Sequence, residues 1–339
     1  MSEAGMDTSV SARRDGRVGR LLLNRPKALN ALDLPMIRAC AAALAAWRDD
    51  PETHAVVIEG AGERAFCAGG DIRAVRTHAM AGETAQVEAF FAEEYELNQT
   101  IASYPKPYIA LIDGICMGGG IGVSVHGTYR VASEHAMFAM PETAIGFFPD
   151  VGATYFLPRL PGRLGLYLGL TGARVQGADA VAAGFATHFV PREALPALSE
   201  ALARDGAAAL GAHARALPPF SLSKHRAAID ECFGEASIPG IVRRLQARGG
   251  AWAEETLTTL RGMSPSALFW SFEAIRRGAA STLPQALARE LALTRAVSRH
   301  PDFHEGVRAM VVDKDRQPKW HPSRIEDVDP GAIERLFAA

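Results

Sequence analysis

The chain has 339 residues with 36 basic and 38 acidic side chains, so its formal net charge is only −2. A balance of this kind creates no global field that would favour nucleic acid or an anionic membrane, and we expect a partner of neither kind. The cysteines form no C-x-x-C pair, which excludes an evident disulfide or zinc framework and favours reduced thiols in a cytosol-like compartment.

The first residues, MSEAGMDTSVSARRDGR, are polar and carry two acidic residues before Arg13. They lack the apolar centre of a signal peptide, their acidic residues are untypical of a mitochondrial transit peptide, and no later apolar run approaches the roughly 20 residues of a membrane span. We therefore expect a cytoplasmic location and no membrane attachment. The composition predicts a disordered tail over residues 1–14, an α/β core over 15–216 and a helical C-terminal region over 217–339.

Strand, glycine loop and helix follow one another twice along the chain. Apolar runs predict strands at 54–59 and 108–112, and glycine loops with helix signals follow both of them. The first loop contains Gly69 and Gly70, and the second contains the run from Gly118 to Gly122. Two such loops can direct two backbone N–H groups at one atom, as an oxyanion site requires. Taken alone, the first glycine pair is equally compatible with an ordinary tight turn.

Better-known glycine motifs do not fit the second loop, GGGIGVSVHG. Val125 stands where G-x-G-x-x-G needs its last glycine, and no Gly-Lys-Ser/Thr follows for a P-loop. His126 stands where a nucleophile elbow around Ser124 would need glycine. Dinucleotide, P-loop and serine-hydrolase interpretations are therefore excluded.

Acidic residues and helix caps give further candidates. Glu142 and Asp150 lie among apolar neighbours in PETAIGFFPDVG, although Asp150 is equally a candidate N-cap for the helix that follows. A long helix is predicted at 84–103, where glutamates 93, 94 and 96 would ordinarily form a solvated face. The N-caps predicted elsewhere are Asp33, Ser264 and Ser281. We expect no metal site, because a proline interrupts His300 and His304 and favours surface or capping histidines.

The chain resembles the crotonase (enoyl-CoA hydratase/isomerase) superfamily over almost its whole length, and most closely the 3-hydroxyisobutyryl-CoA hydrolase branch. The matching segments are PKALNAL (26–32), FCAGGDI (66–72), EEYELN (93–98), KPYIALIDGICMGGGIGVSVHG (106–127), FAMPETAIGFFPDVG (138–152), THFV (187–190) and FHEGVRAMVVDKDRQPKW (303–320). The resemblance implies a crotonase-like (ClpP/crotonase) α/β fold, a spiral of ββα units with a helical C-terminal region.

The resemblance also implies roles for individual residues. It assigns the two oxyanion-hole N–H groups to Gly70 and Gly119, catalysis to Glu142 and Asp150, and a place in the acyl pocket near the substrate hydroxyl to Glu94. The CoA moiety is expected to pass five residues, largely through backbone contacts: Lys27, Ala28, Ala68, Asp71 and Ile72.

The acids distinguish between reactions of this superfamily. The family's hydratases carry one glutamate three residues after the oxyanion glycine and a second twenty residues later; here these positions hold Gly122 and Glu142. The remaining acid, Asp150, matches the hydrolase branch. The resemblance therefore implies hydrolysis of a short branched 3-hydroxyacyl-CoA. The leading substrate is 3-hydroxyisobutyryl-CoA, and the implied pathway is valine catabolism. No cofactor is expected, because CoA is part of the substrate. Glu142 is expected to act either as nucleophile or as general base.

Two other functions stay open on the sequence. Glu142 alone could support an enoyl-CoA hydratase or isomerase, and a crotonase that only binds acyl-CoA would need no acid at all. Related proteins commonly form trimers or hexamers, so a homo-oligomer is a candidate assembly, although the altered C-terminal portion of this branch leaves its form open.

Overall fold

The computed structural model describes residues 9–338. These residues form two compact units, each built from segments distant in sequence. The first contains the chain up to Asp71, then Glu93–Phe138 and Val175–Phe220. The second contains Ile72–Ala92, Ala139–Arg174 and the chain from Ser221 onward. The predicted division at 216/217 stays a prediction.

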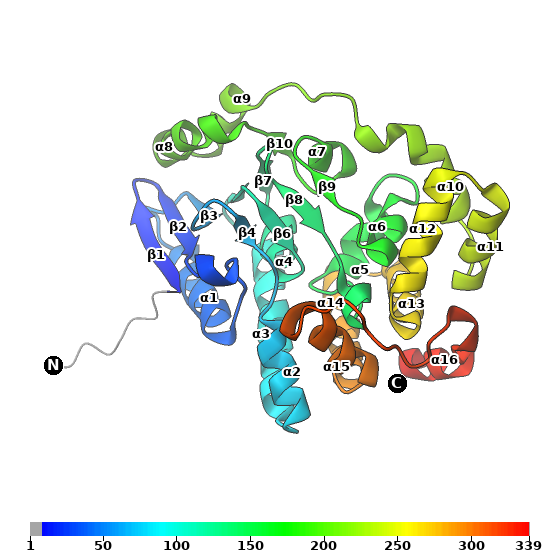
Figure 1. Cartoon of the computed structure of the whole chain (residues 1–339). Helices are drawn as coiled ribbons and strands as arrows, with labels where there is room; N and C mark the ends of the chain where they lie inside the picture. The colour runs from blue at the N-terminus through cyan, green and yellow to red at the C-terminus, as the bar shows by residue number, and fades with distance from the viewer. Residues whose placement is uncertain (1–8, 339) are drawn as a thin grey trace. The chain divides into compact units, whose positions relative to one another are not determined.

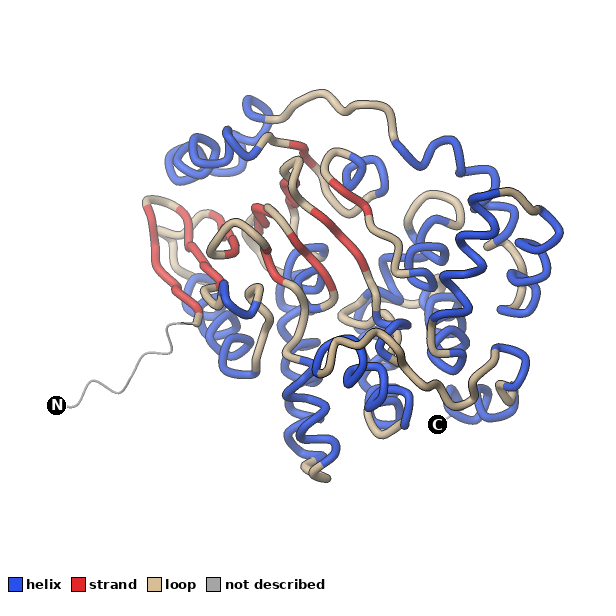
Figure 2. The backbone as a smooth tube through the Cα atoms, viewed as in Figure 1, coloured by secondary structure: helices blue, strands red, loops and turns tan. Residues whose placement is uncertain are grey.

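The first unit is built on two β-sheets. One has six strands in the order β1-β2-β3-β5-β7-β10, parallel except for the antiparallel β1–β2 pair, and the other has four in the order β4-β6-β8-β9. The strands, red in Figure 2, are β1 (Val10–Asp15), β2 (Val18–Leu23), β3 (Ala55–Gly60), β4 (Ala65–Cys67), β5 (Tyr108–Ile112), β6 (Ile115–Met117), β7 (Tyr129–Ala132), β8 (Met137–Ala139), β9 (Val175–Gln176) and β10 (His188–Phe189).

The predicted disordered tail differs from the structure in its second half. Residues 1–8 lie outside the described residues, but Val10–Asp15 pairs with β2 in register from Val10 opposite Leu23 to Asp15 opposite Val18. The segment SARRD is mostly polar, so it lacks the apolar alternation by which a strand is recognised in sequence. It forms a strand because it pairs with the apolar strand β2.

Helices cover both faces of the six-stranded sheet (Figure 1). Val18 and Val57 pack with Leu198 and Leu202 of α8 in one buried cluster. Successive strand residues point to opposite faces of the sheet, so Gly19, next to Val18, faces the side covered by α1, where it lies against the ring of Trp47. The helices and helical turns of this unit are α1 (Leu34–Arg48), α4 (Gly119–Val125), α7 (Asp179–Ala183), α8 (Leu195–Asp205), α9 (Leu210–His213), η1 (Pro26–Ala28), η4 (Arg192–Ala194) and η5 (Gly206–Ala209).

The second unit is helical. The boundary between the units falls inside α3 (Thr84–Ala102). The other helices are α2 (Ile72–Met80), α5 (Ala153–Phe156), α6 (Leu164–Thr171), α10 (Arg226–Cys232), α11 (Ile238–Arg248), α12 (Ala251–Gly262), α13 (Pro265–Gly278), α14 (Leu283–Val297), α15 (Pro301–Val307) and α16 (Pro330–Ala338), with the turns η2 (Glu142–Ile145), η3 (Leu157–Arg159), η6 (Ser221–His225), η7 (Arg308–Val312) and η8 (Ile325–Asp327). Among the described residues, no helix has both the length and the apolar character that crossing a membrane requires.

Capping agrees with the sequence at three helices and differs at one. Asp33 and Ser264 are N-caps as predicted, and they accept from the N–H groups of Met36 and Ala267; His300 caps α15. Ser281 was expected to cap α14, and that prediction is wrong: Thr282 is the cap and completes a capping box with Gln285, while the Ser281 hydroxyl donates to the carbonyl of Arg277. The reciprocal pair of bonds is what favours the threonine.

Candidate active site

Two glycine loops of the first unit bring together the N–H groups predicted to form an oxyanion hole. A Cβ built on Gly119 would lie 3.2 Å from the backbone nitrogen of Gly70, and one built on Gly69 would lie 3.8 Å from the nitrogen of Gly119. Gly69 and Gly118, which precede the two donors, have φ of +115° and +46°, a region that favours glycine. Within residues 9–338, neither donor N–H bonds to another protein group.

The chain segment before α1 fixes the position of Gly70. Leu32 donates to the carbonyl of Gly69 (2.8 Å) and accepts from Asp71 N–H (2.7 Å), so it forms a parallel bridge with Gly70. In such a bridge the N–H of the middle residue points away from its partner strand. The Gly70 N–H is therefore directed away from Leu32 and left available.

Asn30 anchors this segment, and sequence reasoning did not identify it. Its side chain is fully buried and donates to the carbonyls of Ala61 and Ala65, both at 2.9 Å, while its Oδ1 accepts from the N–H of Arg25. The backbone of Asn30 lies in the left-handed region, with φ of 56°. Asparagine tolerates that conformation better than most residues, which is the one signal that PKALNAL offered.

Glu94 lies beside the two donors. It is only 2% exposed, and a Cβ on Gly119 would clash with its Oε1. Glu94 therefore departs from the solvated face that a run of glutamates ordinarily forms, whereas Glu93 is partly exposed and pairs with Arg38. Glycine at position 119 thus serves two purposes: it exposes the N–H and it leaves room for the carboxylate.

Glu142 is a buried carboxylate of the second unit. It opens η2 directly after Pro141 and is 6% exposed. Its Oε2 has no hydrogen-bond partner among the described residues. Burial, and secondarily the negative charge of Asp150, raise the pKa of Glu142 well above its ordinary value. An acid held in this state is suited to exchanging a proton or attacking an electrophile.

Packing fixes the segment between Glu142 and Asp150. Phe147 stacks on Phe148 with ring centroids 4.7 Å apart, and it lies 5.6 Å from Phe91 and 5.5 Å from Phe303. All four rings are fully or nearly fully buried. Aromatic pairs of this kind add to area burial, so the GFFPDVG segment between the two acids is held rigidly within the second unit.

Asp150 does not cap the next helix. The N-cap of α5 is Gly152, which has φ of 82°, and Asp150 lies two residues before it. The interpretation of Asp150 as a helix cap is therefore wrong. Asp150 is 6% exposed and acts electrostatically on Glu142.

The residues expected along the CoA moiety are surface or half-buried positions. Lys27 and Ala28 are exposed in η1, Ala68 is half-buried after β4, and Ile72 begins α2. Asp71 forms an ion pair with Arg25 at 3.3 Å. Their predicted contacts with CoA stay a prediction.

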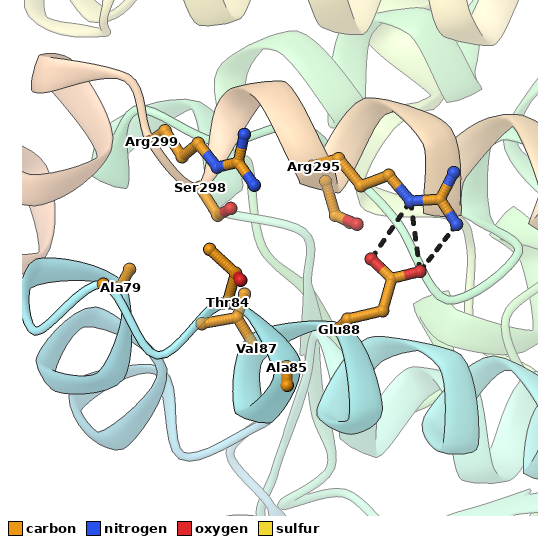
Figure 3. Close-up of a pocket in the computed structure, with 10 residues that line it drawn as sticks. Ala79, Thr84, Ala85, Val87, Glu88, Arg295, Ser298 and Arg299 are labelled. Atoms are coloured by element: carbon orange, nitrogen blue, oxygen red, sulfur yellow. Dashed lines mark hydrogen bonds and ion pairs between the residues drawn. The ribbon is translucent and has the colours of Figure 1, made fainter.

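A cavity of about 480 Å³ in the second unit has a different lining (Figure 3). Arg295 of α14 donates to Glu88 of α3 across it, and Ser298 and Arg299 lie on the same side as Arg295. None of the predicted site residues is among those that line it. This cavity therefore gives no support to the predicted chemistry.

Comparison with known proteins identifies the family. A family model described as enoyl-CoA hydratase/isomerase matches residues 18–337. The chain belongs to the enoyl-CoA hydratase/isomerase family. The mitochondrial 3-hydroxyisobutyryl-CoA hydrolase of Xenopus tropicalis is 47% identical over 96% of this chain and 87% of that protein. The human protein of the same name is 45% identical over 97% of this chain and 88% of its own. These identities assign this family member to the 3-hydroxyisobutyryl-CoA hydrolase branch.

Two solved structures of the family share the fold. The structure of a carnitinyl-CoA dehydratase from Mycobacterium thermoresistibile has a TM-score of 0.94 and 42% identity, covering 98% of this chain and 97% of that one. That of an enoyl-CoA hydratase from Rhodobacter sphaeroides has a TM-score of 0.92 and 41% identity, with the same coverage. The predicted crotonase-like α/β fold is therefore confirmed.

One prediction is overturned by the same relatives. Those from Xenopus tropicalis, Danio rerio and human are all named as mitochondrial proteins. This contradicts the expected cytoplasmic location, which rested on the polar character of the first residues. Composition alone is a weak guide to targeting, because the signals that direct a chain are short and variable.

Proposed function

We propose that this protein hydrolyses the thioester of 3-hydroxyisobutyryl-CoA, giving 3-hydroxyisobutyrate and free CoA, a step of valine catabolism. The observation that carries the proposal is the buried pair Glu142 and Asp150, in a chain 47% identical to a 3-hydroxyisobutyryl-CoA hydrolase. The substrate class is consistent with the family, and the acids select the reaction.

The N–H groups of Gly70 and Gly119 stabilise the charge that develops on the thioester oxygen. Both are free of protein acceptors within residues 9–338, so donation to an incoming oxygen sacrifices no existing bond. Preorganised donors of this kind typically contribute about 10²- to 10³-fold each to the rate. Glu94, beside these donors, lines the acyl pocket near the substrate hydroxyl.

Glu142 supplies the attacking group. As nucleophile, its carboxylate oxygen bonds to the thioester carbon, the C–S bond breaks, CoA leaves as the thiol after protonation, and water hydrolyses the mixed anhydride. As general base, Glu142 removes a proton from the water that attacks the same carbon. In either case the ionised carboxylate is the reactive form. Asp150 orients the substrate hydroxyl and modulates the proton affinity of Glu142.

A second candidate is addition of water to an enoyl-CoA, or its reversal. The solved structures from Mycobacterium thermoresistibile and Rhodobacter sphaeroides carry the names dehydratase and hydratase at 42% and 41% identity. Against this function stands Gly122, which occupies the place of the first hydratase glutamate and has no side chain with which to move a proton.

Release of free CoA separates the candidates. Wild type and Glu142→Ala are incubated with 3-hydroxyisobutyryl-CoA, 3-hydroxypropionyl-CoA and crotonyl-CoA, and thiol is measured with a chromogenic reagent. We expect release from the two hydroxyacyl substrates by wild type, and loss of at least about 10³-fold in the variant. Absence of thiol release together with hydration of crotonyl-CoA would instead establish the second candidate. CoA binding retained by the variant serves as the folding control.

A further inference from the structure

Glu290 makes a three-fold contact with the turn that follows Asp150. Its Oε2 accepts from Gly152 N–H at 2.7 Å, and its Oε1 accepts from Thr154 N–H at 3.0 Å and from the Thr154 hydroxyl at 2.5 Å. Glu290 lies on α14, 138 residues away in sequence from Gly152, and is fully buried. Residues of α14 and α5 contact one another, and the Glu290 carboxylate caps the first turn of α5 from α14.

The turn that Glu290 holds is strained. Val151, a β-branched residue, has φ of 53°, and Gly152 follows with φ of 82°. A β-branched side chain in the left-handed region is a genuine outlier that costs on the order of 1–3 kcal/mol and persists only where the surroundings enforce it. The backbone bonds from Ala153 N–H to the carbonyl of Asp150 and from Tyr155 N–H to that of Gly152 close the turn. The three hydrogen bonds of Glu290 restrain the turn further.

Holding this turn fixes the direction of Asp150. The carboxylate of Asp150 precedes the strained pair by one residue, and its charge is close enough to act on both Glu142 and Glu290. A change in the φ and ψ angles of Val151 would rotate the chain directly after Asp150. An acid that orients a substrate tolerates displacement poorly, since about 1 Å of misplacement can cost roughly 10²-fold in rate.

We propose that Glu290 is a positioning residue: through the Val151–Gly152 turn it holds Asp150 in the orientation that recognises the substrate hydroxyl. The proposal rests on the function proposed above for Asp150. In this role Glu290 does not touch the substrate. It acts only through the N–H groups of Gly152 and Thr154 and the Thr154 hydroxyl.

The test compares a hydroxylated with a non-hydroxylated substrate. CoA release from 3-hydroxyisobutyryl-CoA and from isobutyryl-CoA is measured above pH 8, because burial raises the pKa of Glu290 to about 8 and only its ionised form accepts with both oxygens. The proteins compared are wild type, Glu290→Gln, Thr154→Val and Asp150→Asn. In Glu290→Gln the amide oxygen can still accept from Thr154, but the amide NH₂ faces the N–H of Gly152 and cannot accept from it. Thr154→Val removes only the bond from the Thr154 hydroxyl. Glu235→Gln, which changes a hydrogen-bonded acid of the same unit outside this turn, is the matched control. Thermal unfolding establishes that each variant is folded.

We expect the preference for the hydroxylated substrate to fall about 10- to 100-fold in Glu290→Gln and Asp150→Asn, and by a smaller factor in Thr154→Val. Release from isobutyryl-CoA should change by less than about three-fold in Glu290→Gln and Thr154→Val, and Glu235→Gln should match wild type with both substrates. A preference lost in Asp150→Asn but kept in Glu290→Gln and Thr154→Val would overturn the positioning role alone. A preference unchanged in Asp150→Asn would overturn the proposed role of Asp150 and this inference with it. If Glu290→Gln does not fold, the substrate preference of Thr154→Val tests the positioning role on its own: a reduced preference supports it and an unchanged one overturns it.

Discussion

At the scale of single residues, the role proposed for Glu142 makes the activity depend on the protonation of its carboxyl group. Burial removes its carboxylate from water, and Asp150 adds a negative charge, so both raise the pKa of Glu142. The reactive form under either mechanism is the carboxylate. Activity should therefore increase as pH rises through this elevated pKa.

The dependence of kcat/KM on pH tests this electrostatic argument. In Asp150→Asn the charge that raises the pKa of Glu142 is removed, so the rising limb should move to lower pH while staying above the ordinary value for glutamate, because burial remains. Rates measured across the pH range with isobutyryl-CoA, which lacks the hydroxyl, isolate this effect from substrate recognition. A rising limb at the same pH in both proteins would exclude the coupling.

Gly119 is predicted to admit no side chain. A Cβ there would clash with Oε1 of Glu94 and lie 3.2 Å from the nitrogen of Gly70. Gly119→Ala should reduce kcat by about 10²- to 10³-fold, the worth of one oxyanion donor. Gly211→Ala, in the same unit and with no atom within 4 Å of its added methyl, is the control and should match wild type. Equal activity of the two variants would contradict the assigned role.

At the scale of elements, the loop from Arg25 to Asp33 positions Gly70, and Asn30 is its anchor. Loss of the Asn30 amide would leave the carbonyls of Ala61 and Ala65 without their partner. Alanine is also less tolerant of φ near 56°. Each buried group left unsatisfied costs about 1–3 kcal/mol.

Urea unfolding of two variants tests this. Asn30→Ala should lower the free energy of unfolding by roughly 2–5 kcal/mol. Asp33→Ala, which removes only the N-cap bond to Met36 and the partly exposed ion pair with Arg25, should lower it by about 1 kcal/mol. If Asn30→Ala proves no more costly than Asp33→Ala, the loop is held by other contacts.

The contact between α14 and α5 gives the unfolding free energy a dependence on pH. Burial, and after it the charge of Asp150, raise the pKa of Glu290 to about 8, against the opposing hydrogen bonds from Thr154 and Gly152. The folded protein therefore retains a proton that the unfolded chain releases near pH 4.5. The stability linked to Glu290 is fully present below about pH 4.5 and is lost as pH rises toward 8, by up to roughly 5 kcal/mol.

Denaturant unfolding at several pH values between 4.5 and 8 measures this loss. The decline should be shallower in Glu290→Gln, which cannot titrate, and unchanged in Glu235→Gln. Glu142 contributes to the same window in every variant, so the difference between wild type and Glu290→Gln is the quantity of interest. Parallel curves for these two proteins would mean that Glu290 stays ionised when folded.

Sequence patterns predicted the local elements and missed what distant segments supply. The helix expected at 84–103 is α3 (Thr84–Ala102), and the strand expected at 108–112 is β5. By contrast, Asp150 as a cap was a reasonable local prediction, overturned because Glu290 takes the N–H groups from across 138 residues. No periodicity or spacing records such a contact, since it arises from tertiary packing alone.

At the scale of the whole molecule, membership of the family was readable from the printed motifs, and the fold follows from it. FCAGGDI and MGGG carry the two donor loops, and PETAIGFFPDVG carries both acids. The location was not readable in this way, and relatives named as mitochondrial contradict the cytoplasmic expectation. A net charge of −2 excluded nucleic acid as an expected partner but carried no information about compartment.

Hydrolysis and dehydration can be told apart on one substrate. The protein is incubated with 3-hydroxyisobutyryl-CoA while free thiol and the absorbance of an α,β-unsaturated thioester are followed together. Hydrolysis releases CoA, whereas a hydratase running in reverse removes water and leaves the thioester intact. We expect thiol to appear without unsaturated product, and no thiol from Glu142→Ala. Unsaturated thioester forming without thiol would contradict the hydrolase assignment.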